Sequence, residues 1–140
     1  MAGVNYLLDS NILSEPTRQH PDGEVRSRLQ AYRREICTAA PILHELRYGV
    51  ARMSDGARKR QLLRYLERVL LPLMVLPYDG EAALWHAEER ARLAAQGRTP
   101  AYVDGQIAAI AKTNDLTLVT RNTSDFVHFA DLRVENWFAS

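Results

Sequence analysis

The sequence predicts a three-layer α/β fold in which a parallel five-stranded sheet is covered by helices on both faces. Five short apolar segments alternate with longer segments whose apolar residues recur at helical spacing, and this alternation is typical of parallel sheets. The chain has 140 residues, of which 46% are hydrophobic and 25% charged. These values suit one globular core, and we predict a single domain over residues 1–140.

The first predicted strand covers residues 4–8 and ends abruptly at Asp9. Its sequence, VNYLL, has little polar interruption, which is typical of a central strand buried on both faces. Asp9, Ser10 and Asn11 follow at its carboxyl end, where ligands bind in open α/β sheets. The same residue types are common in turns and helix N-caps, so Asp9 is a functional candidate only if other acids reach the same place.

The other strands and the helices follow from periodicity and from their boundary residues. Strands are predicted at residues 35–39, 73–76, 116–119 and 133–137. A short helix is predicted between Asp9 and about residue 16, and a second one follows Asp22. Three further helices are predicted at 41–53, 57–71 and 79–96, and a last one begins at residue 99. Pro41 suits a first turn, Gly97 a left-handed cap, and Thr99 with Pro100 the N-cap and first residue of the last helix.

Two further acids lie beside apolar residues near predicted helix starts. Glu45 falls at the edge of an apolar stripe that contains Ile42 and Leu46, and a carboxylate half in the core needs a partner or a cation. Asp104 interrupts the apolar segment AYVDGQIAAIA in the second turn of its predicted helix, where the helix dipole explains an acid less well. Polar residues 120–125 follow the fourth strand.

These four places can meet in one crevice at the carboxyl ends of the strands. Four carboxylates in one cleft repel each other without a cation, and oxygen ligands select Mg²⁺ or Mn²⁺ over zinc. A metal held in this way suits phosphodiester hydrolysis, because it lowers the pKa of a bound water and neutralises charge on the phosphate.

The four acidic segments, in this order, resemble those of the PIN-domain ribonucleases, and among them the VapC-type toxins of bacterial toxin–antitoxin pairs. LLDSNIL is similar to the first motif of that family, HELRYG to the second, DGQIAAIA to the third and LVTRNTSDF to the fourth. The resemblance covers nearly the whole chain. It implies a flavodoxin-like arrangement and Mg²⁺-dependent RNA cleavage, in which Mn²⁺ can substitute.

The resemblance also implies a set of site residues. The acidic quartet, as catalytic and metal-binding residues, would be Asp9, Glu45, Asp104 and Asp125, assisted by Asn11, Thr120 and Asn122. In the fourth motif Asn122 and Asp125 both remain candidates for the fourth ligand.

The resemblance further implies a homodimer that is inhibited by a cognate antitoxin in a larger hetero-oligomer. The wide apolar faces of residues 43–53 and 62–70 are where we expect an antitoxin segment to bind, with a basic residue directed toward the acids.

Competing enzyme classes fail at single positions. A haloacid-dehalogenase phosphatase needs a second acid two residues after Asp9, where Asn11 stands. A zincin helix needs a histidine four residues after His44, where Tyr48 stands. The alternative that stays open is a catalytically inactive PIN-like module that binds nucleic acid or a protein partner, and the presence of all four acids favours the enzyme.

Other features place the protein in the cell and argue against a membrane protein. The longest apolar stretch, residues 69–76, is interrupted by Pro72, and no basic segment precedes an apolar one at the start, so neither a membrane span nor a signal peptide is expected. The single cysteine, Cys37, lies in an apolar segment and indicates a small core residue in a reducing cytoplasm.

The basic residues and histidines are given structural interpretations. All but two of the 18 basic residues are arginine, and three of them recur at helical spacing: Arg60, Arg64 and Arg68. We interpret this stripe as a solvated face in preference to a nucleic-acid track. Three histidines are not spaced as metal ligands usually are, and we interpret them as surface or capping residues: His20, His86 and His128.

Overall fold

A parallel sheet of five strands forms the centre of the computed structural model, which describes residues 3–139. The strand order is β3-β2-β1-β4-β5, and each neighbouring pair is parallel. The strands are β1 (Tyr6–Leu8), β2 (Ile36–Ala39), β3 (Met74–Leu76), β4 (Thr117–Val119) and β5 (Val134–Glu135). The predicted fold class, with its five-stranded parallel sheet, is confirmed.

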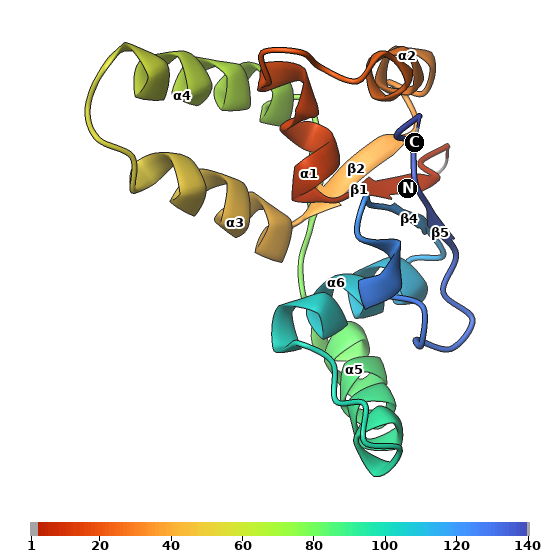
Figure 1. Cartoon of the computed structure of the whole chain (residues 1–140). Helices are drawn as coiled ribbons and strands as arrows, with labels where there is room; N and C mark the ends of the chain where they lie inside the picture. Colours follow the sequence, from red (N-terminus) through yellow and green to blue (C-terminus); the bar gives the residue numbers. More distant parts are fainter. Residues whose placement is uncertain (1–2, 140) are drawn as a thin grey trace.

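Helices cover both faces of this sheet. They are α1 (Ser10–Leu13), α2 (Gly23–Ala31), α3 (Ala40–Ala51), α4 (Ala57–Leu70), α5 (Gly80–Ala95) and α6 (Tyr102–Thr113), with short 3₁₀ turns η1 (Glu15–Thr17) and η2 (Thr123–Asp125). Figure 1 shows α5 and α6 below the sheet and α1, α2 and α4 above it. Helix α3 contacts both α1 and α6, so it spans the two layers next to the carboxyl ends of the strands.

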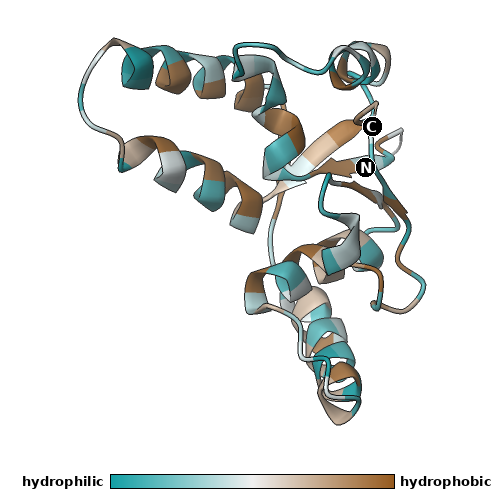
Figure 2. Ribbon diagram, viewed as in Figure 1, coloured by the Kyte–Doolittle hydropathy of each residue, from teal (hydrophilic) through white to brown (hydrophobic). Residues whose placement is uncertain are grey.

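The first strand, β1, is the central strand of the five. Leu7 pairs with Cys37 of β2 on one side and with Leu118 of β4 on the other, and all three side chains are fully buried. Figure 2 shows the hydrophobic residues concentrated along the strands. The apolar run before Asp9 therefore forms a central strand, as its composition predicts.

Several helix boundaries agree with local signals in the sequence. The side chain of Asp22 accepts a hydrogen bond from the backbone N–H of Val25, and Asp79 accepts one from Ala82, as expected of N-caps. Gly97, just beyond α5, has φ +71°, which is the left-handed conformation that favours glycine.

The predicted start of the last long helix is wrong. Helix α6 begins at Tyr102 and not at Pro100, and its N-cap is Ala101, which makes no side-chain cap. The ring of Tyr102 packs against His86 of α5, with centroids 5.0 Å apart, so a contact between helices prevails over the local capping preference of Thr99. As a consequence Asp104 lies in the first turn of α6, where the helix dipole favours an acid.

Within residues 3–139 the structure contains no helix that combines the length and the apolar character needed to span a membrane.

Candidate active site

Asp9 is the buried centre of the site. It is the N-cap of α1 at the carboxyl end of β1 and is only 6% exposed. Its Oδ1 accepts a hydrogen bond from the backbone N–H of Ser10 at 2.8 Å, and its Oδ2 accepts one from Thr120 Oγ1 at 2.8 Å. Burial raises the pKa of Asp9, while these two hydrogen bonds act in the opposite direction.

A hydrogen-bond network joins the ends of β1 and β4 around Asp9. Asn11 Nδ2 donates to Thr120 Oγ1 at 3.3 Å, and Asn11 Oδ1 accepts the backbone N–H of Arg121 at 3.0 Å. The same Thr120 oxygen accepts the backbone N–H of Asn122 at 3.1 Å. The structure thus brings Asn11 and Thr120 to Asp9, whereas Asn122 joins the network through its backbone and is otherwise exposed.

Asp104 shows that the four carboxylates share one region. Burial and then the negative charges of Asp125, Asp9 and Glu45 raise the pKa of Asp104 to about 6. Interactions between exposed charges fade beyond about 8 Å in physiological salt. The four acids come from four separate parts of the fold, namely the end of β1, the second turn of α3, the first turn of α6 and η2.

Glu45 and Asp125 are exposed, unlike Asp9. For Glu45 this is a correction, because the apolar stripe of α3 places only Ile42, Leu46 and Val50 in the core. Glu45 instead lines two cavities. One, of about 600 Å³, also contains Asp104 and Tyr78, and the other, of about 370 Å³, lies between α1, α3 and α4.

The donor set suits a hard divalent cation. Over residues 3–139, no three side chains of His, Cys, Asp or Glu converge closely enough to enclose a metal ion by themselves. Mg²⁺ retains several waters and binds through one or two carboxylates. Asp9 and Asp104 could therefore bind the ion directly, while Glu45 and Asp125 accept hydrogen bonds from its water ligands. Burial and then the charges of the other three acids raise the pKa of Asp104, and a bound cation would offset both effects.

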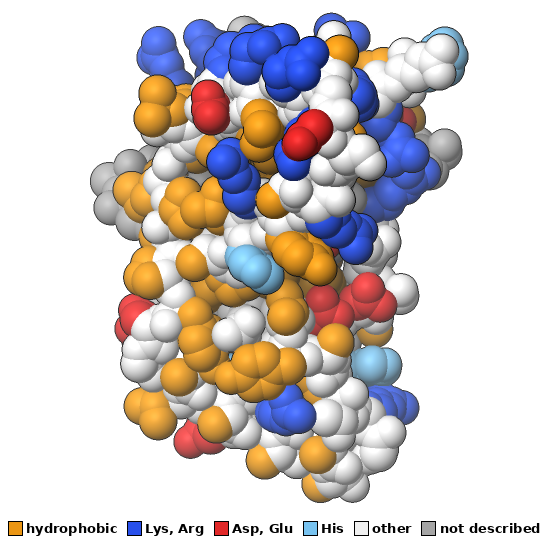
Figure 3. All heavy atoms as spheres, turned by 90° about the vertical axis from the view of Figure 1, so that its left-hand side faces the viewer, with side chains coloured by type: hydrophobic (Ala, Val, Ile, Leu, Met, Phe, Trp, Pro, Cys, Tyr) orange, Lys and Arg blue, Asp and Glu red, His pale blue; other side chains and the backbone are white. Residues whose placement is uncertain are grey.

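The face in front of the strand ends carries two kinds of surface. Figure 3 shows Lys and Arg side chains gathered at the top, where α4 lies, and hydrophobic side chains across the middle. The stripe of Arg60, Arg64 and Arg68 is exposed. Lys59 has a structural contact instead, since its Nζ donates to the carbonyl of Ala51 at the end of α3 at 3.0 Å.

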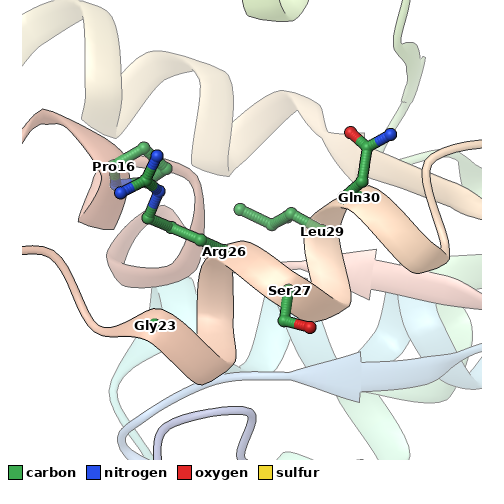
Figure 4. Close-up of a pocket in the computed structure, with 6 residues that line it drawn as sticks. All are labelled: Pro16, Gly23, Arg26, Ser27, Leu29 and Gln30. Atoms are coloured by element: carbon green, nitrogen blue, oxygen red, sulfur yellow. The ribbon is translucent and has the colours of Figure 1, made fainter.

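A hollow on α2 is separate from the acids. It has a volume of about 600 Å³ and is lined by Pro16, Gly23, Arg26, Ser27, Leu29 and Gln30 (Figure 4). No carboxylate lines this hollow. Two of the four acids, Glu45 and Asp104, line the cavity of about 600 Å³ that we take as part of the candidate active site, whereas Asp9 and Asp125 do not line it.

His86 is the residue whose interpretation from sequence is wrong. It is 2% exposed and its Nδ1 lies 2.8 Å from the Tyr78 hydroxyl, whereas His20 and His128 lie on the surface as expected. The available signal was its place in the helical stripe Ala82, His86, Glu89 and Leu93, all of which are buried. Glu89 lies in the same stripe and is also buried, which the sequence analysis did not predict.

Comparison with known proteins identifies the family of this chain. Residues 6–132 match the PIN domain. Toxin FitB of Neisseria gonorrhoeae (strain ATCC 700825 / FA 1090) is 39% identical over 134 residues, which are 93% of this chain and 96% of that protein. The tRNA(fMet)-specific endonuclease VapC of Shigella flexneri is 33% identical over 134 residues, 96% of this chain and 98% of that protein.

Solved structures agree over the same length. FitAcB from Neisseria gonorrhoeae superposes with a TM-score of 0.85 at 38% identity, covering 94% of this chain and 96% of the other. VapBC2 from Rickettsia felis, bound to a DNA fragment from its promoter, has a TM-score of 0.84 at 27% identity, covering 96% and 99%. The match of residues 6–132, together with a relative that is 39% identical over 93% of the chain, shows that this chain belongs to the PIN domain family.

Proposed function

We propose that this protein is a metal-dependent endoribonuclease and the toxin of a toxin–antitoxin pair. The observation that carries the proposal is that Asp9, Glu45 and Asp125 all lie near Asp104, whose pKa is raised by burial and then by their three negative charges. Relatives of similar length that are named ribonuclease VapC2 (31% identical) or tRNA(fMet)-specific endonuclease VapC (33%) support it.

Asp9 and Asp104 would bind Mg²⁺ directly and Glu45 and Asp125 through its water ligands, and Mn²⁺ can substitute for Mg²⁺. When bound, the ion supplies a hydroxide-like water and neutralises charge on the scissile phosphate. Thr120 Oγ1 donates to Asp9 Oδ2 at 2.8 Å and Asn11 Nδ2 donates to the same oxygen at 3.5 Å, so both side chains orient the Asp9 carboxylate. Asp125 and Asn122 are the two candidates for the fourth ligand, and both lie on the exposed side of the site, where an RNA backbone can approach.

The partner would bind beside α3 and α4. A cavity of about 610 Å³ there is lined mainly by apolar side chains: Leu43, Leu66, Leu70, Leu71, Leu73 and Val75, with Arg47 and Glu67. An antitoxin segment with apolar residues fits this surface, and an arginine from it could replace the charge of the metal among the acids. Solved relatives of the VapBC family of toxin–antitoxin systems support such a partner, and we propose a homodimeric toxin in the cytoplasm.

RNA cleavage with and without metal tests the proposed activity. We expect the purified protein to cut a mixed pool of RNA that includes initiator tRNA in Mg²⁺ or Mn²⁺, leaving 5′-phosphate and 3′-hydroxyl ends, and to be inactive in excess chelator. The matched control is Asp104→Asn, which keeps the shape of the side chain and removes one charge. Equal cleavage in chelator would overturn the proposal, and RNA binding without cleavage would favour the inactive binding module.

A further inference from the structure

The buried histidine of α5 lies against the turn of α6 that carries Asp104. The ring of His86 contacts Tyr102, with centroids 5.0 Å apart, and also reaches Gly105. Asp104 lies between these two residues in the chain. The position of the His86 ring therefore limits where the first turn of α6, and with it the Asp104 carboxylate, can lie.

Gly105 provides the room for this ring. An ideal Cβ on residue 105 would overlap His86 Nε2 and lie 2.6 Å from His86 Cδ2. The other glycines of the described chain would meet nothing within 4 Å. Glycine is unfavourable inside a helix, so its presence in α6 is explained by the close approach of the histidine ring.

Tyr78 holds the other side of the ring. Its hydroxyl lies 2.8 Å from His86 Nδ1, while Nε2 is buried without a hydrogen-bond partner among residues 3–139. The neutral ring with its proton on Nδ1 places only a bare nitrogen against Gly105, because a proton on Nε2 would be buried and unsatisfied. Tyr78 lines the same cavity as Asp104 and Glu45, so the ring connects two sides of the site.

We propose that His86, held by Tyr78 and seated on Gly105, is a positioning residue that sets the Asp104 carboxylate relative to Asp9 and Glu45. The inference rests on the proposed nuclease function, since the exact separation of these carboxylates matters only if they share a metal ion. His86 acts through Asp104 and does not itself touch the substrate.

A double-mutant cycle tests this coupling. Gly105→Ala should force the ring and α6 apart and lower kcat and Mn²⁺ affinity roughly 10- to 100-fold, with a smaller change in KM for RNA. His86→Ala alone loosens the turn and should weaken Mn²⁺ binding less. In the double variant the new methyl group enters the space that the ring has left, so Gly105→Ala should cause no further loss.

The matched control is Gly80→Ala, which also lies in the first turn of a helix but has open space around it and should match the parent. Calorimetric Mn²⁺ titration and RNA cleavage are measured for each variant, and circular dichroism melts confirm folding. Should Gly105→Ala fail to fold, His86→Ala and the double variant must still share one kcat and one Mn²⁺ affinity, both below those of the parent.

Two results would overturn the positioning role. One is a folded Gly105→Ala variant with parental kcat and Mn²⁺ affinity, and the other is a Gly105→Ala effect of equal size with and without His86. A parent protein that binds Mn²⁺ but cuts no RNA rejects the proposed function, while the Mn²⁺ affinities still test the positioning. A parent that does neither rejects both.

Discussion

At the scale of single residues, Asp104 makes stability depend on pH. Its folded pKa of about 6 lies above its ordinary value of 3.8, so between these pH values the folded protein keeps a proton that the unfolded chain has released. The contribution of Asp104 to the free energy of unfolding therefore falls as pH rises from about 4 to 6 and is level above. We expect a loss of about 1–2 kcal/mol, because solvent near this half-buried group screens part of the effect.

The substitution Asp104→Asn isolates this contribution in the metal-free protein. The variant should melt at or above the parent at pH 7.5 in chelator and converge with it near pH 4. It should also gain much less from Mg²⁺, which stabilises a binding-competent protein by about 2.7 kcal/mol at a hundredfold excess over the dissociation constant. Thermal melts with and without Mg²⁺ measure both effects. A variant that melts well below the parent in chelator, yet gains equally from Mg²⁺, would identify Asp104 as a structural residue.

The hydroxyl of Thr120 holds the Asp9 carboxylate, and its removal should affect both stability and cleavage. Its fully buried hydroxyl donates to Asp9 and accepts from Asn122 and Asn11. Thr120→Val keeps the shape but removes the shorter of the two side-chain hydrogen bonds to Asp9, and should lower the free energy of unfolding by about 1–3 kcal/mol and reduce cleavage. Thr120→Ser keeps the hydroxyl and is the control. Denaturant unfolding and RNA cleavage measure the difference, and equal behaviour of Val and Ser would exclude a role for the hydroxyl.

At the scale of elements, α5 anchors the segment that follows Asp125. Glu89 accepts hydrogen bonds from Arg92 at 2.7 Å and from the backbone N–H of Ala130 at 2.9 Å, and Arg92 donates to the carbonyl of His128 at 2.9 Å. The hydrogen bonds from Arg92 lower the pKa of Glu89, so its charged form is held in the fold. One helix thus contacts the first turn of α6 through His86 and this loop through Glu89.

Removal of Glu89 should release the loop. Glu89→Ala leaves the N–H of Ala130 without its acceptor, so we expect a loss of about 1–3 kcal/mol in stability and faster hydrogen exchange at Ala130. The neighbouring Glu88 is exposed, and Glu88→Ala should change neither quantity. Amide exchange by NMR and chemical unfolding are the measurements. Unchanged exchange at Ala130 in Glu89→Ala would contradict the anchoring role.

At the scale of the whole molecule, the apolar cavity that we propose for the main contact with the partner is lined by none of the four acids. Leu71 is 88% exposed and lines the apolar cavity beside α3 and α4, away from the four acids. Leu71→Arg should therefore leave stability and RNA cleavage unchanged and weaken binding of the antitoxin, because it places a charge against apolar side chains.

Binding of the cognate antitoxin, once it is identified, is measured by calorimetry and provides the test. Leu84 is 73% exposed on α5 and does not line this cavity, so Leu84→Arg is the control and should bind normally. Equal affinities of the two variants would place the partner elsewhere. Loss of cleavage in Leu71→Arg would show that the two surfaces are not independent.

The fold and the order of the acids could be predicted because they depend on short-range patterns. The apolar run before Asp9 forms a central strand, and Asp22, Asp79 and Gly97 lie at the helix boundaries that their side chains favour. Asp115 and Asp131 have φ values of +56° and +57°, a turn conformation that aspartate tolerates. These preferences act within one turn of chain, so neighbouring residues suffice to set them.

The sequence by itself therefore determined the order of strands and helices and the acids that follow them. Only the tertiary structure decided that Glu45 is exposed, that Asp104 lies in a first turn, and that His86 is buried against Gly105. The physical reason is that each of these depends on how α3, α5 and α6 contact one another, and such contacts between distant segments override local preference.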